Sequence, residues 1–74
     1  MNEKINREKI CKALSRLSET MEELSTLWEA VQFDDDNETD DILCELYPFK
    51  ASFDELTMDV QTWAYNAIGK IENL

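Results

Sequence analysis

The sequence contains no histidine, only one glycine and only one proline, and these scarcities narrow the possible folds and activities. Without an imidazole, the chain lacks the most common acid–base catalyst and metal ligand, which removes most hydrolase mechanisms and zinc sites. With so few turn-forming residues in 74 positions, a few long helices are favoured over many short strands. The sequence therefore predicts an all-α protein.

Long apolar runs and a signal-peptide core are also missing, so we expect no membrane-spanning segment. The two cysteines, Cys11 and Cys44, have no metal-binding or redox spacing, and two reduced thiols of a cytoplasmic protein are expected. A chain of this length forms one domain at most. Residues 1–74 are therefore predicted to be a single helical domain.

Basic residues are scarce beyond the first sixteen positions. Residues 1–16 have a net charge of +3, residues 17–59 of −13, and residues 60–74 of zero. The run from Phe33 to Glu45 alone holds seven carboxylates and no basic residue. Such a surface repels nucleic acid and attracts basic proteins. We therefore expect no direct contact with nucleic acid, no membrane contact, and a basic protein as the partner.

The spacing of apolar residues predicts a long first helix over about residues 3–32. Its stripe recurs every three or four positions and consists of Ile10, Leu14, Leu17, Met21, Leu24, Trp28 and Val31. The aspartates at 34–36 should end this helix, because they have low helix propensity and would meet the negative end of its macrodipole.

Two further helices are predicted. A short helix over about residues 40–47, capped by Asn37, Thr39 or Asp40, should end before Pro48. The S-x-x-E capping box that begins at Ser52 predicts a long helix over about residues 53–72. The apolar stripe of this helix consists of Phe53, Leu56, Val60, Trp63, Ala64, Ala67, Ile68 and Ile71. Met58 and Tyr65 lie off the stripe, where they either pack under the short helix or remain exposed for a partner.

The two long helices should form an antiparallel hairpin, which the short helix completes as a three-helix bundle. A two-stranded coiled coil through the first stripe is a poor alternative, because Met21 and Trp28 do not suit its narrow core. A homodimer in which two hairpins form a four-helix bundle remains open.

The carboxylates allow two chemical alternatives. Asp34, Asp36, Glu38, Asp40 and Glu45 fall at the ligand positions of an EF-hand-like calcium loop. However, Thr39 occupies the position that requires glycine and Asp41 occupies the usual apolar position. Catalysis would require paired carboxyl groups in an apolar cleft, and no nucleophile or oxyanion motif accompanies these acids. We predict a protein that is not an enzyme and has neither a cofactor nor a metal.

In size, acidity and helical make-up, the chain resembles small inhibitors encoded by phages and mobile elements, among them DNA-mimic anti-restriction and anti-CRISPR proteins. This resemblance implies a protein that occludes a basic, nucleic-acid-binding surface of a host or regulatory protein. Carboxylates spaced along helices can imitate the phosphate charges that such a surface binds.

The leading hypothesis is therefore a non-enzymatic acidic binding protein. Its partner-binding charge would come from Asp34, Asp35, Asp36, Glu38, Asp40, Asp41 and Glu45, extended by Glu22, Glu29, Asp54 and Asp59. Tyr47 and Phe49, beside these acids, would be apolar anchors. The alternative is a self-associating helical assembly module whose acids provide solubility, with Leu27, Met58 and Tyr65 as contact residues.

Overall fold

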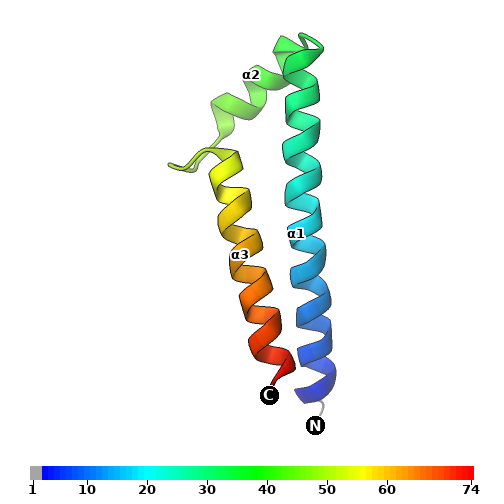
Figure 1. Ribbon diagram of the computed structural model, residues 1–74. Helices are drawn as coiled ribbons and strands as arrows, with labels where there is room; N and C mark the ends of the chain where they lie inside the picture. The colour runs from blue at the N-terminus through cyan, green and yellow to red at the C-terminus, as the bar shows by residue number, and fades with distance from the viewer. Residues whose placement is uncertain (1–2) are drawn as a thin grey trace.

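The computed structural model describes residues 3–74, which form three helices and no strand. They are α1 (Glu3–Phe33), α2 (Asn37–Leu46) and α3 (Phe53–Glu72). Helices α1 and α3 lie side by side in antiparallel orientation, and α2 leads from the far end of α1 back to the start of α3 (Figure 1). The predicted all-α hairpin with a short third helix is confirmed.

The hairpin is elongated, with extents of 50 × 19 × 18 Å and a radius of gyration of 15.8 Å. A compact chain of 74 residues would have a radius of gyration of about 11 Å. Helix α1 contacts both other helices. Among residues 3–74, no helix combines the length and the apolar character that crossing a membrane requires.

The helix boundaries follow the local sequence. Helix α2 begins at Asn37, three residues earlier than predicted, because Asp36 is its N-cap and accepts the Thr39 N–H at 3.2 Å. Tyr47 is extended before Pro48 and ends the helix as expected. The predicted cap of α3 is confirmed, since Ser52 Oγ accepts the Glu55 N–H at 3.2 Å.

Helix α3 packs against a narrower part of α1 than the apolar stripe predicts. Leu14 is buried, and its neighbours Cys11 and Ser18 are half-buried on one side. On its other side, Ile10 is 50% and Leu17 is 41% exposed. Leu24 is also exposed. The prediction that these three belong to the core was therefore wrong, because a single neighbouring helix covers one ridge of α1 and leaves the adjacent ridge open.

Small residues allow α1 and α3 to approach closely. Ala64 is only 1% exposed, and Thr57 is buried one heptad before it. Ser18 and Ser25, both half-buried, lie on the α1 side of the interface. Trp63 belongs to the predicted apolar stripe of this helix, but it is 58% exposed. It directly precedes Ala64 and therefore points to one side of the interface.

Candidate functional site: the acidic end

The acidic turn between α1 and α2 begins with a Schellman motif. Asp36 N–H donates to Val31 O at 3.1 Å, and Asp35 N–H donates to Gln32 O at 3.3 Å. Both bonds form only when the residue at the turn adopts the left-handed helical conformation, and Asp35 does so with a φ of 57°. Glycine usually occupies this position, so the acidic turn retains a carboxylate where the backbone would favour glycine.

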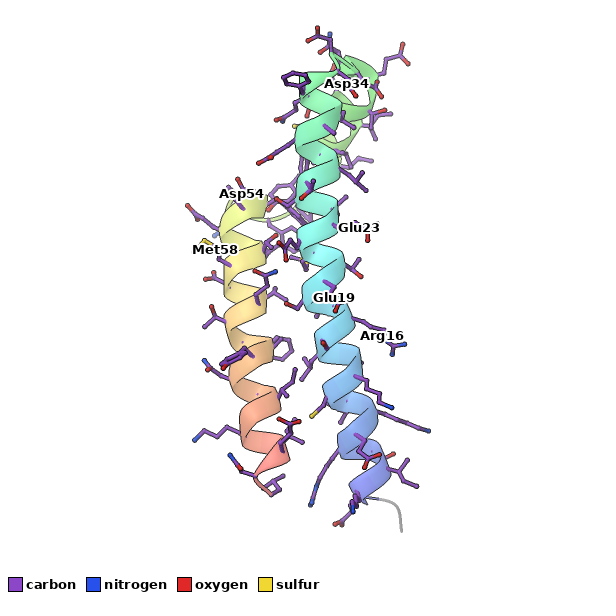
Figure 2. The ribbon with its side chains drawn as sticks, turned by 45° about the vertical axis from the view of Figure 1, so that its right-hand side comes forward. Arg16, Glu19, Glu23, Asp34, Asp54 and Met58 are labelled. Carbon is purple, nitrogen blue, oxygen red and sulfur yellow. The ribbon has the colours of Figure 1, made fainter. Side chains whose placement is uncertain are left out.

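Asp36 connects the turn to α2. Besides the Thr39 N–H, its carboxylate accepts the Thr39 hydroxyl at 2.7 Å. Asp34 and Asp35 make no side-chain hydrogen bond among the described residues. Asp36 is therefore a structural cap, whereas Asp34 and Asp35 are exposed on the end of the molecule. Figure 2 shows Asp34 at the tip of α1, remote from the start of α3.

Asp40 is half-buried, and its carboxylate faces α1. Its Oδ1 accepts the indole N–H of Trp28 at 2.8 Å and the side-chain amide of Gln32 at 3.1 Å. The bond from Trp28, followed by the bond from Gln32, holds the pKa of Asp40 below its ordinary value of 3.8. The Sγ atom of Cys44 lies 3.7 Å from the same oxygen. Desolvation, and secondarily the charge of Asp40, raises the pKa of the Cys44 thiol.

An aromatic cluster holds α2 and the following loop against the hairpin. The ring of Trp28 lies 5.9 Å from that of Tyr47 and 5.6 Å from that of Phe53, centre to centre. Tyr47 also packs edge-on against Phe49 at 5.2 Å, and its hydroxyl donates to Ala51 O at 2.7 Å. Tyr47 is half-buried and Phe49 is 53% exposed. Of the two predicted anchors, Phe49 has the larger free surface.

The outer face of α2 combines acids with unexpected apolar residues. Ile42 is 57% exposed and Leu46, one turn later, is 75% exposed. On α2, Ile42 and Leu46 lie within one helical turn or so of the exposed carboxylates Glu38, Asp41 and Glu45, and the exposed Phe49 follows in the loop after α2. We call these six residues the α2 face. The candidate site predicted from the sequence did not include Ile42 or Leu46. The sequence does indicate that one apolar side of this helix is exposed. Ile42 and Leu46 form one apolar line, Leu43 and Tyr47 form a second, and α1 can cover only one of the two lines.

The four predicted extensions of the site lie on different sides of the hairpin. Ser25 Oγ donates to Asp54 Oδ1 at 2.8 Å, and Asp54 lines a shallow cavity together with Glu29. Glu22 lies farther along the same side, where Gln61 Nε2 donates to it at 3.5 Å. Asp59 follows the buried Thr57 by two residues, which places it on the opposite, outer surface of α3. The structure therefore groups Glu22, Glu29 and Asp54 but not Asp59.

The carboxylates between residues 34 and 45 do not converge on one point. Within residues 3–74, no group of three or more potential ligands is close enough to hold a metal ion. Two of the five positions in the calcium alternative, Asp36 and Asp40, already accept hydrogen bonds from Thr39 and Trp28. Both cysteines are free.

The acidic part of the chain, residues 17–59, also lacks internal charge compensation. Among the described residues, the one ion pair joins Arg7 to Glu3 at 3.7 Å, within the basic segment of α1. No described carboxylate between residues 17 and 59 has a cationic partner. The arrangement therefore presents concentrated negative charge to solvent around an apolar patch. Comparisons with protein families, with curated proteins and with solved structures give no match to this chain.

Proposed function

We propose that this protein is a non-enzymatic binding protein whose acidic end occludes a basic surface of another protein. The observation that carries the proposal is the absence of any ion pair among the described carboxylates of residues 17–59. Intramolecular neutralisation would stabilise the fold, and like charges placed close together destabilise it. A basic partner that binds this end would remove the repulsion.

The α2 face supplies the short-range part of the interaction. Stable interfaces commonly have apolar anchors at their centre and polar residues at their rim. Ile42, Leu46 and Phe49 would be the anchors, and Glu38 and Asp41 belong to the rim. Charge steers the partner towards the site and increases the association rate, whereas burial of the apolar side chains slows dissociation.

The partner class follows from the charge of the surface. A groove that binds nucleic acid is lined with arginine and lysine that contact phosphates, and exposed carboxylates on a helix can occupy the same groups. We therefore propose an inhibitor of the nucleic-acid-mimic type, of which anti-CRISPR and anti-restriction proteins are examples, acting in the cytoplasm on a host or regulatory protein. The two free cysteines support a reducing compartment.

Affinity capture from a lysate of the native host, followed by elution with a salt gradient, tests this proposal. Captured proteins should elute as salt increases, because surface charge interactions are screened. Duplex DNA or RNA added at constant ionic strength should release the same proteins, since both ligands would occupy one surface. Retention that is insensitive to salt, or captured proteins that nucleic acid does not displace, would contradict the proposal.

A second candidate function, self-association as an assembly module, is favoured by one specific observation. Helix α1 exposes Leu17 and Leu24, which belong to its apolar stripe, together with Leu27. This face lies on the hairpin itself and is distinct from the α2 face.

A further inference from the structure

One apolar side of α1 has no neighbour within the described chain. Ile10 and Leu27 are 50% and 53% exposed, and Leu17 and Leu24 are also exposed. The positions that form this side recur at heptad spacing and include no charged residue. They are Ile10, Ala13, Leu17, Thr20, Leu24 and Leu27. We call them, together with Trp63, the open face.

Trp63 belongs to the open face because the opposite side of the hairpin is identified by its hydrogen bonds. Gln61 donates to Glu22 and Ser25 donates to Asp54, so these four residues mark one side of the α1–α3 pair. Met58 and Tyr65 follow Asp54 and Gln61 by four residues, which places them on that same side. Trp63 and Gln61 lie on opposite sides of the line of buried residues, Thr57 and Ala64, that faces α1. Trp63 is therefore on the side of α3 that adjoins Leu17 and Leu24.

The amount of exposed surface also indicates a missing neighbour. The chain exposes 6218 Å², whereas a compact monomer of 8.7 kDa would expose about 4,700 Å². The excess is about 1,500 Å², and a stable interface buries about 800 Å² on each partner. An interface of that size along the open face would therefore remove about half of this excess.

The charges beside the open face select the occupant and its direction. Arg16 and Glu23 are one heptad apart and project from the same side of α1, away from α3 (Figure 2). If a second α1 packs antiparallel across the open face, with the two-fold axis between these residues, each Arg16 lies beside Glu23 of the other copy. The basic residues between positions 3 and 16 of each copy then lie along acidic residues of the other. Parallel pairing would place like charges together.

We propose that two copies of the chain pack through their open faces into an antiparallel four-helix bundle, in which α1 pairs with α1. Gln61 donates to Ser18 O at 3.3 Å, so Trp63 lies level with the middle of α1 and close to the two-fold axis. The two tryptophans pack against each other there. The two α2 faces lie at opposite ends of the dimer and remain free. This inference rests on the second candidate function, self-association, and is independent of the binding of a basic partner.

Sedimentation equilibrium of the purified chain at several concentrations tests the dimer. The expected result is a reversible monomer–dimer equilibrium that the double substitution Leu17→Glu/Leu24→Glu shifts to monomer, with helicity retained in circular dichroism. Met58→Glu/Tyr65→Glu is the matched control, because it adds the same charge to the opposite side and should leave the dimer intact. A monomer at all concentrations overturns the proposal, as does a dimer that only the control substitution disrupts.

Charge exchange tests the register without changing the apolar face. Arg16→Glu and Glu23→Arg should each weaken the dimer about tenfold, since each substitution creates two like-charge pairs. The double variant should restore the original dissociation constant, because it re-forms both pairs with unchanged net charge. Both side chains are exposed, so folding should be preserved. A double variant as weak as the single variants, or single variants that dimerise normally, overturns the antiparallel register.

Discussion

The hydroxyl of Thr57 gives the sharpest stability prediction. Thr57 is 7% exposed, and its Oγ1 has no hydrogen-bond partner among the described residues. Burying an unpaired hydroxyl costs about 1–3 kcal/mol. Valine has the same shape without the hydroxyl and a similar helix propensity. Thr57→Val should therefore raise the free energy of unfolding by about 1–2 kcal/mol, which corresponds to an increase in Tm of about 4–16 °C for a domain of this size.

Urea denaturation followed by circular dichroism, at one fixed protein concentration, measures this effect. Thr57→Ser is the matched control, because it keeps the hydroxyl and removes the buried methyl group. It should lower the stability by about 1 kcal/mol. If Thr57→Val were no more stable than the original chain, the hydroxyl would have a partner, and Thr57 would not be an unsatisfied buried group.

Three further predictions concern the turn after α1, the hydrogen-bonded carboxylate of Asp40 and the contact between α1 and α3. Asp35→Gly should stabilise the protein by about 1 kcal/mol in thermal melts, because the φ of 57° suits glycine; Asp35→Asn separates the effect of charge from that of the backbone. Asp40 has a lowered pKa, so its bonds stabilise the fold above pH 3.8 and are lost as the pH falls through the native value. Trp28→Phe should return that pKa, followed by carboxyl NMR, towards 3.8, and an unchanged value would contradict the assignment. Ala64→Leu should destabilise the hairpin by about 1–3 kcal/mol, because Ala64 is only 1% exposed, whereas Ala30→Leu on the exposed side should have little effect in the same denaturation assay.

Much of the fold was predictable because the local signals agree with one another. The apolar spacing of α1, the extended residue before Pro48 and the Ser52 cap each specify local backbone geometry, and each is present in the structure. The start of α2 was less predictable, because Asp36, Asn37, Thr39 and Asp40 are all good capping residues. Which of them caps α2 depends on the end of α1, where Asp36 N–H also completes the Schellman motif.

The assignment of core residues could not be completed from the sequence. A heptad pattern shows which residues are apolar, but it does not show which ridge of the helix the neighbouring helix covers. In this chain Ser18 and Ser25 face α3, although serine is not an apolar residue, while Leu17 and Leu24 remain exposed. The small side chains matter because they allow close packing against Ala64.

The charge of the candidate site could be predicted from the sequence, but the contacts and the exposure of its individual residues could not. The sequence indicates the acidic run directly, but the roles within it depend on tertiary contacts. Asp40 bonds to Trp28, which lies 12 positions away in α1. Ile42 and Leu46 become exposed because α1 covers only the Leu43 and Tyr47 side of α2.

The central claim is that the α2 face, and not net charge alone, binds a basic partner. The most direct test is to titrate a captured partner with two variants of equal charge change. One variant is Glu38→Gln/Asp41→Asn/Glu45→Gln in the α2 face, and the other is Glu3→Gln/Glu8→Gln/Glu72→Gln at the opposite end of the hairpin. We expect the first variant to lose at least tenfold in affinity and the second to bind like the original chain. Equal losses for both variants would contradict the central claim.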